Sequence, residues 1–170
     1  MRDLEEIEQT RTIPAFPGYE VTNFGRVFNR ETGREMVLSP TIHGDLTVGL
    51  HRDHKQYRRS VKVLVANAFC YGYSELFGTP IQLDGNLRNL HASNIVWRPR
   101  WFAWLYSRQF YEIPEWVYDR PVVDITNKIE YTNIYEAAIT RGQLFNDIRR
   151  SIFNGDTVFP TGEEYIYKLV

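Results

Sequence analysis

The sequence is poor in cysteine, in long apolar runs and in charge of one sign. Cys70 is the single cysteine among 170 residues, which excludes an internal disulfide framework and any cysteine-rich zinc site. No apolar run approaches the roughly 18 residues of a membrane-spanning helix. The formal net charge is −1, so the chain as a whole carries no basic excess that would indicate nucleic-acid binding. We therefore expect a cytoplasmic protein with no membrane partner, and we expect it to carry no cofactor.

Aromatic side chains, by contrast, are abundant. The chain has 11 Tyr, 10 Phe and 4 Trp, and its hydrophobic (43%) and charged (24%) fractions are typical of globular proteins. This composition excludes disorder over most of the length, and the length suffices for one ordinary domain or two small ones. The N-terminal residues MRDLEEIEQT are charged and lack the apolar region of a secretory signal. We expect residues 1–12 to form a polar arm or a short helix.

Short alternating runs separated by Pro, Gly, Asn and Asp predict a small antiparallel β module over residues 13–62. The apolar segment 63–69 suits a short buried helix. Two short strands, 80–83 and 94–97, flank a long polar loop, and a helix over 101–110 follows. The sequence thus predicts an α+β fold that begins with strands.

The C-terminal part is separated from the rest by a Pro-punctuated segment, 113–121, which is typical of a linker. A strand is expected at 122–126, followed by a hairpin return and two helices. Asn133 with Glu136 three residues later is a capping box, which marks the start of the first helix. Residues 164–169 are expected to form a last strand.

Four blocks of the sequence occur in a recognisable order. They are GYEVTNFGRVFNRETGRE (18–35), VKVLVANAF (61–69), IQLDGNLRNLHASNIVW (81–97) and RPVVDITNKIEYTNIYEAAITRGQLFNDI (120–148). Together they resemble HNH homing endonucleases of the phage and intron-encoded type. In that family the second block is written V-H-R-L-V-A-x-A-F and the third D-H-x-D-G-N-x-x-N-N-x-x-x-N-L-x-W. The first three blocks are specific in combination, and the fourth resembles the family's C-terminal helix-turn-helix.

The resemblance implies a degenerate ββα-metal core between a small antiparallel β module and a C-terminal strand–helix–helix unit. It divides the chain into an arm (1–12), an HNH-like region (13–112, with the β-rich module 13–62 and the ββα core 63–112), a linker (113–121) and a helix-turn-helix-like unit (122–170).

Departures from the family pattern fall on the catalytic positions. The family's Asp-His pair, a metal ligand and the general base, corresponds to Ile81 and Gln82. The second ligand, on the following helix, corresponds to Ala103, and only the central Asn is kept, as Asn94. Phosphodiester cleavage needs a cation and a base to activate water, and these side chains supply neither. We therefore expect no catalytic residue and no metal ligand.

Residues near these positions leave one alternative, an active nuclease with a relocated site around Asp84, His91 and Asn94. Against it, Asp84-Gly85-Asn86 is first of all a turn signal, and a loop histidine is more often hydrogen-bonded to backbone. No pair of histidines has metal-ligand spacing. We therefore favour the hypothesis that catalysis is lost over the hypothesis of a relocated active site.

Candidate DNA contacts come from two regions. Residues 13–62 carry eight basic and five acidic residues, a net charge of +3, and in the family this region holds the duplex. Surface arginines are also common on faces that contact only solvent. The expected DNA-binding residues are Arg26, Arg30, Arg34, Arg52, Lys55, Arg58, Arg59 and Lys62, with Gln143, Arg149 and Arg150 in the C-terminal unit.

The helix over 101–110 is apolar all round, which indicates burial either in the core or by a partner. Trp101, Phe102 and Trp104 are the candidate partner-binding residues, with Trp104 and Leu105 expected to point inward. The leading hypothesis is a catalytically inactive HNH homing-endonuclease-like protein of phage origin that retains binding to double-stranded DNA. The alternative is an interaction protein that binds a viral or host protein through this helix. Either would act in the host cytoplasm or in the virion.

Overall fold

A computed structural model describes residues 7–169, which form two compact units. The first unit comprises the chain up to Gln82 together with Asn86–Arg98, and the second comprises Leu83–Gly85 and the chain from Pro99 onward. The mixture of helices and small antiparallel sheets confirms the expected α+β class. No helix within residues 7–169 is long and apolar enough to cross a membrane.

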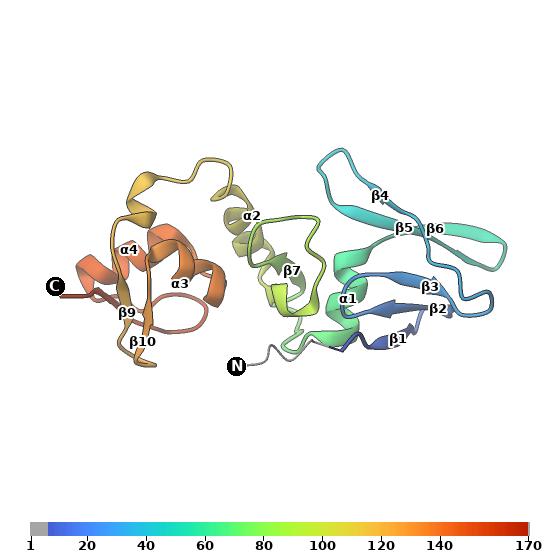
Figure 1. Cartoon of the computed structure of the whole chain (residues 1–170), viewed down its shortest axis with the longest axis horizontal. Helices are drawn as coiled ribbons and strands as arrows, with labels where there is room; N and C mark the ends of the chain where they lie inside the picture. The colour runs from blue at the N-terminus through green and yellow to red at the C-terminus, as the bar shows by residue number, and fades with distance from the viewer. Residues whose placement is uncertain (1–6, 170) are drawn as a thin grey trace. The chain divides into compact units, whose positions relative to one another are not determined.

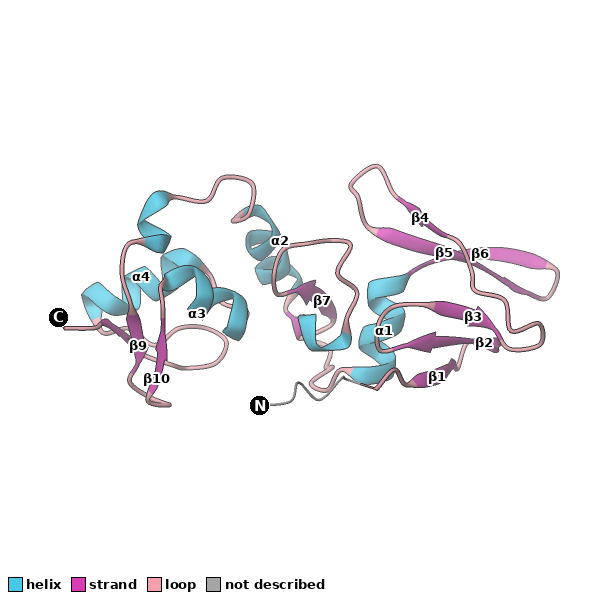
Figure 2. Ribbon diagram, viewed as in Figure 1, coloured by secondary structure: helices cyan, strands magenta, loops and turns pink. Residues whose placement is uncertain are grey.

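The first unit contains two three-stranded antiparallel sheets, a β-hairpin and one α-helix (Figure 1). Figure 2 shows the two sheets as separate strand groups with α1 beside them. The elements are β1 (Thr10–Ile13), β2 (Phe16–Thr22) and β3 (Val27–Asn29) in one sheet, β4 (Leu38–Pro40), β5 (Leu46–Arg52) and β6 (Lys55–Ser60) in the other, then α1 (Val61–Phe69), β7 (Thr79–Gln82), the 3-10 turn Ala92–Asn94 and β8 (Ile95–Arg98).

Helix α1 lies at the centre of the first unit's core. Val61 and Val65 are fully buried and pack with Val27 and Leu50 from the two sheets. The helix ends at Phe69, and burial raises the pKa of the thiol of the following Cys70 to about 11. The thiol is therefore protonated at neutral pH and is not a nucleophile.

The N-terminal arm differs from the sequence-based expectation. Residues 1–6 of the expected arm lie outside the described residues, but Thr10 begins strand β1, which pairs antiparallel with β2 from Thr10↔Thr22 onward. Gln9 N–H donates to Asn23 Oδ1 at 2.7 Å, just before the strand. The expected polar arm or short helix is therefore wrong for residues 10–12, which form a strand because their backbone pairs with β2. Local sequence does not reveal this pairing.

The second unit combines a three-stranded antiparallel sheet with three α-helices. The sheet order is β10-β9-β11. The elements are α2 (Arg100–Arg108), a 3-10 turn (Glu115–Tyr118), β9 (Val122–Asp124), β10 (Ile129–Tyr131), α3 (Ile134–Arg141), α4 (Phe145–Asn154) and β11 (Tyr165–Tyr167).

The expected capping box begins α3, as the sequence predicts. Asn133 Oδ1 accepts the N–H of Glu136 at 2.8 Å, and Glu136 Oε2 in turn accepts the N–H of Thr132 at 2.6 Å. Gly142 ends the helix in the left-handed conformation, with φ 64°, which glycine adopts without a Cβ penalty. These local signals set the turn between α3 and α4.

The Pro-punctuated segment 113–121 contributes to the core of the second unit. Its 3-10 turn places Val117 in full burial beside Val122 and Ile134. The compact units divide between Arg98 and Pro99, whereas the resemblance ends the HNH-like region at residue 112. That segmentation remains a prediction.

Candidate nuclease-like site and nucleic-acid interface

The position expected for a general base is filled by Gln82, at the end of β7, which is only 4% exposed. Its Nε2 donates to the carbonyl oxygens of Asn86 at 3.0 Å and Asn89 at 3.1 Å. Because both partners are acceptors, they fix the orientation of the amide. Within residues 7–169, Gln82 Oε1 is a buried side-chain oxygen without a hydrogen-bond donor. Gln82 thus holds the loop and offers no basic atom.

The Asn94 side chain is hydrogen-bonded to the same loop. Its Nδ2 donates to the carbonyl of Asn89 at 3.1 Å, which is the carbonyl that also accepts from Gln82. The neighbouring Ile81 is buried in the hairpin and has no lone pair. The two amides therefore order the residues between β7 and β8 through a shared acceptor.

Ala103 belongs to the second unit and lies on the buried face of α2, where its N–H donates to Pro99 O at 2.9 Å. Its methyl group cannot ligate a metal. Within residues 7–169 no group of three His, Cys, Asp or Glu side chains is placed to hold a metal ion. Ile81 and Ala103 offer no ligand atom, and Gln82 and Asn94 offer only neutral amide oxygens, whereas a hard divalent cation needs several oxygen ligands, with carboxylates among them. The residues at these positions do not fit a divalent metal.

The residues of the relocated site are divided between the units. Asp84 lies in the second unit, and His91 and Asn94 lie in the first. His91 caps the 3-10 turn: its Nδ1 lies 2.6 Å from Ser93 Oγ and accepts the N–H of Ser93 at 3.3 Å. Its ring also packs on Phe24, with centroids 4.7 Å apart. The turn geometry accounts for this imidazole without a catalytic role.

Ion pairs and backbone carbonyls engage several of the basic side chains expected to contact DNA. Arg26 Nε donates to Glu8 Oε1 at 2.9 Å, and this hydrogen bond lowers the pKa of the Glu8 carboxyl. Lys62 Nζ pairs with Asp45 Oδ1 at 3.0 Å. Arg30 donates to Pro17 O at 3.0 Å and Arg52 donates to Ala15 O at 3.1 Å. These cations already have partners within the first unit.

Arg58 and Arg59 are adjacent in sequence but occupy different environments. The Arg59 guanidinium lies over the rings of Phe16 and Tyr57, at 5.2 and 5.3 Å from their centroids. Arg58 follows on the opposite face of β6, as the strand alternation requires. Within residues 7–169, Arg34, Lys55 and Arg58 have no ion pair and no side-chain hydrogen bond. These three cations are therefore available to a ligand.

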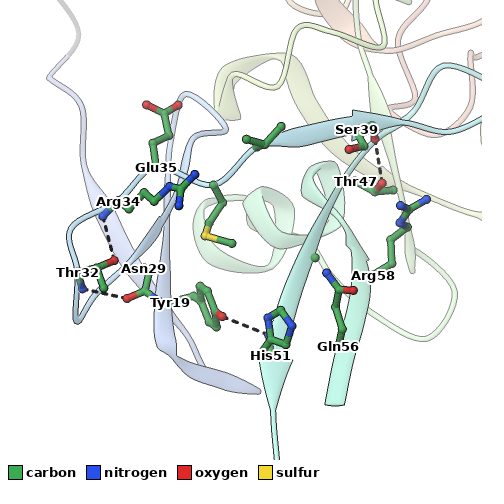
Figure 3. A pocket seen from close by; sticks show the side chains of 13 residues that line it. Tyr19, Asn29, Thr32, Arg34, Glu35, Ser39, Thr47, His51, Gln56 and Arg58 are labelled. Carbon is green, nitrogen blue, oxygen red and sulfur yellow. Dashed lines mark hydrogen bonds between the residues drawn. The ribbon is translucent and has the colours of Figure 1, made fainter. Parts of the chain in front are cut away.

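A polar cleft of about 620 Å³ contains two of these three cations, Arg34 and Arg58 (Figure 3). One wall is the outer face of the β4–β5–β6 sheet, where the register pairs Gly49 with Arg58 and His51 with Gln56. The other wall is formed by β2, β3 and the turn after β3. The lining residues are Tyr19, Asn29, Thr32, Arg34, Glu35, Met36, Val37, Ser39, Thr47, Gly49, His51, Gln56 and Arg58.

Internal hydrogen bonds order most of the cleft's small polar groups. Tyr19 Oη accepts the N–H of His51 at 3.2 Å, Thr47 Oγ1 donates to Ser39 O at 2.9 Å, and Asn29 Oδ1 accepts two backbone N–H groups of the following turn. The cleft is therefore a preformed polar surface, and its two guanidinium groups have no ion pair within the described part of the chain. The cleft was not predicted as a site from the sequence, although the alternation of polar residues along residues 47–58 is a signal that could have indicated one polar face.

The three C-terminal residues expected to contact DNA differ in exposure: Gln143 is buried, whereas Arg149 and Arg150 are exposed. Gln143 is fully buried, so the DNA-facing role expected for it is wrong. Its amide donates to Glu163 Oε2 at 2.8 Å and accepts from Tyr165 Oη at 2.7 Å. Arg149 is exposed with its guanidinium 4.7 Å from the Trp116 ring centroid, and Arg150 is ion-paired with Asp147.

The polar residues around the α3–α4 turn thus have a structural explanation. Arg141 Nε donates to Glu163 Oε1 at 2.9 Å, and Gln143 binds the other oxygen of the same carboxylate. The sequence gives no indication of this role for Glu163, which lies in a polar loop segment. The unit as a whole has eight basic and eleven acidic residues, a net charge of −3, which disfavours it as the main DNA-binding surface.

The aromatic helix α2 is oriented differently from the expectation. Phe102 is fully buried against Tyr106 and Phe159, so it cannot be a partner-binding residue. Trp104, expected to point inward, is 58% exposed and Trp101 is 55% exposed. The expectation failed because a helix that is apolar all round has no sequence pattern that selects its inner face.

Comparison with known proteins relates this arrangement to one solved structure. The structure, entitled "DNA binding and cleavage by the HNH homing endonuclease I-HmuI", is similar to this chain with a TM-score of 0.55 and 22% sequence identity, over 95% of this chain and 99% of that one. The chain has an HNH homing-endonuclease-like fold. No protein-family model matches it, and no curated protein matches it significantly. The HNH-like fold confirms the coarse resemblance drawn from the sequence blocks.

Proposed function

We propose that this chain is a catalytically inactive HNH homing-endonuclease-like protein of bacteriophage origin that retains binding to double-stranded DNA. The observation that carries the loss of cleavage is Gln82, whose amide is fixed by two loop carbonyls at the position of the family's general base. An amide has no useful proton affinity near neutral pH, and one general base supplies roughly 10²–10⁴-fold in rate. Ile81 and Ala103 remove the metal ligands as well.

The observation that supports DNA binding is the polar cleft of the first unit. A β-sheet face that carries arginine and amide side chains is suited to the major groove, where two-stranded ribbons fit. Among residues 7–169, the Arg34 and Arg58 side chains have no ion-pair partner, so neither has to break an ion pair in this part of the chain before it meets a phosphate or a base. The net charge of the first unit is positive, with twelve basic and ten acidic residues, and a positive charge favours binding to DNA.

Supercoiled plasmid is expected to remain uncut when incubated with the protein and Mg²⁺, Mn²⁺ or Ca²⁺. The double change Ile81→Asp with Gln82→His should restore at most weak nicking, because Ala103 still lacks a ligand atom. Plasmid nicking by the unchanged protein and by the double variant is compared on agarose gels, with Asn94→Ala as the control. Metal-dependent nicking by the unchanged protein that is lost in Asn94→Ala or His91→Ala would show that the relocated site is active.

Duplex affinity is expected to fall with salt, with a slope of log K on log salt of about −0.9 per phosphate contact. Arg58→Ala should reduce the magnitude of that slope by roughly one unit if its guanidinium meets a phosphate, or weaken binding without changing the slope if it meets a base. Arg59→Ala is the matched control, since Arg59 stacks on Phe16 and Tyr57 and should change the slope less. Fluorescence anisotropy with mixed-sequence duplex measures the affinity and the salt slope of both variants. Absence of binding by the unchanged protein at about 50 mM salt would reject the DNA-binding proposal.

A second candidate function is protein binding through α2. The specific observation that favours it is the exposure of two tryptophans on one helix, because exposed aromatic residues are enriched at the centres of interfaces. The Trp104 ring lies 4.6 Å from the Arg108 guanidinium, which gives the surface a cationic edge. Loss of partner capture in Trp101→Ala and Trp104→Ala, with DNA binding unchanged, would favour this function.

A further inference from the structure

Two neighbouring side chains in the polar cleft have the chemistry of base readers. Gln56 and Arg58 are two residues apart on β6, so both project from the same face of the sheet, as Figure 3 shows. Neither side chain has a hydrogen-bond or ion-pair partner within residues 7–169. In the major groove a glutamine amide pairs with adenine N6 and N7, and an arginine pairs with guanine O6 and N7.

Gly49 on the neighbouring strand determines where the Gln56 amide lies. A Cβ added at Gly49 would stand 2.4 Å from Gln56 Nε2, so the amide occupies the space that any other residue at position 49 would fill. Gly49 pairs with Arg58 in the sheet register, whereas Gln56 pairs with His51, so the Gln56 amide reaches over the residue directly opposite Arg58. The glycine therefore positions the Gln56 amide against the sheet, next to Arg58.

The spacing of the two side chains agrees with that of stacked bases. Two residues along a strand rise about 6.7 Å, and two base-pair steps rise about 6.8 Å along a DNA strand. A strand lying along the groove would therefore bring the two side chains to bases within two steps of each other. Arg34, on the opposite wall of the cleft, would face the adjoining phosphate backbone.

We propose that Gln56 and Arg58 are the sequence-specificity determinants of this chain, reading an adenine and a guanine within two base pairs of each other. The proposal rests on the proposed DNA-binding function and adds to it the base chemistry that the cleft recognises. Arg58 contributes a bidentate guanidinium as well as a charge. Gln56 contributes no charge, so its effect falls on sequence preference and not on the electrostatic part of binding.

The test is selection of bound duplexes from a pool with a randomised central segment, followed by anisotropy titration of the enriched sequence and its single-base variants. The unchanged protein should enrich an adenine and a guanine one or two positions apart. Gln56→Ala should lose roughly 10-fold discrimination at the adenine alone, and Arg58→Lys should do so at the guanine alone while it keeps the charge and the salt slope. Gly49→Ala should reproduce the Gln56→Ala result, because it displaces the amide without removing it.

Lys55→Ala is the matched control, since this exposed cation on the same strand lies outside the cleft and should not change the preference at either base. Circular dichroism melting of each variant verifies that the fold is retained. Enrichment of a motif that none of the Gln56, Arg58 and Gly49 variants alters would overturn the inference and leave DNA binding intact. Binding without any enriched motif would overturn it too, whereas no binding at all would reject the proposed function itself.

Discussion

Phe102→Ala is expected to lower the free energy of unfolding by about 3–5 kcal/mol, the usual cost of truncating a buried large aromatic. Phe102 is fully buried, and its ring stacks on Tyr106 with centroids 6.1 Å apart and packs on Phe159 at 5.6 Å. Removing the ring would leave a cavity among side chains contributed by α2 and the loop that precedes β11. Denaturant unfolding followed by circular dichroism measures the change.

Trp104→Ala is the matched control on the same helix. Trp104 is exposed and its ring lies beside the Arg108 guanidinium, so the variant should lose less than about 1 kcal/mol. Equal destabilisation by the two changes, or a larger loss for Trp104→Ala, would show that α2 presents its other face to the core.

Arg141→Met is expected to lower the free energy of unfolding by about 2–4 kcal/mol. Glu163 is 1% exposed, and Arg141 is the cation that pairs with it, so the variant leaves a buried carboxylate with the neutral amide of Gln143 as its main remaining donor. Removing one partner of a buried pair costs about 3–5 kcal/mol, reduced here because the Arg141 side chain is one-third exposed. The readout is again denaturant unfolding at neutral pH.

Two further variants distinguish a buried pair from an ordinary surface one. Arg150→Ala breaks an ion pair with Asp147 on the exposed side of α4 and should cost less than about 1 kcal/mol. Adding Glu163→Gln to Arg141→Met should recover part of the loss, since the buried group is then neutral. If Arg141→Met cost no more than Arg150→Ala, the Glu163 network would not stabilise the α3–α4 turn.

Much of the local structure could be predicted from the sequence because short-range signals specify it. The Asn133 capping box and the strands around the 84–93 loop occur where turn and cap chemistry placed them. The order of the four sequence blocks likewise predicted the HNH-like fold. In each case the determining residues are neighbours in the chain or lie within one recognisable block.

Long-range packing could not be predicted in the same way. Strand β1 depends on its pairing with β2, the inner face of α2 depends on which rings reach Phe102, and the burial of Gln143 depends on Glu163, 20 residues later. Likewise, a basic residue available for DNA cannot be told from one already paired, because the partners of Arg26 and Lys62 lie 18 and 17 residues away. Only the fold reveals that Arg34 and Arg58 line one cleft and have no ion pair with any residue from 7 to 169.

DNA binding without cleavage can be tested on a single supercoiled plasmid. The protein is added at a concentration that fully retards the plasmid on a native gel, with Mg²⁺ or Mn²⁺ present, and the DNA is then stripped of protein and its topology is measured. We expect the retarded plasmid to be recovered supercoiled. Recovery of nicked or linear DNA that depends on the metal and is absent in Asn94→Ala would contradict it.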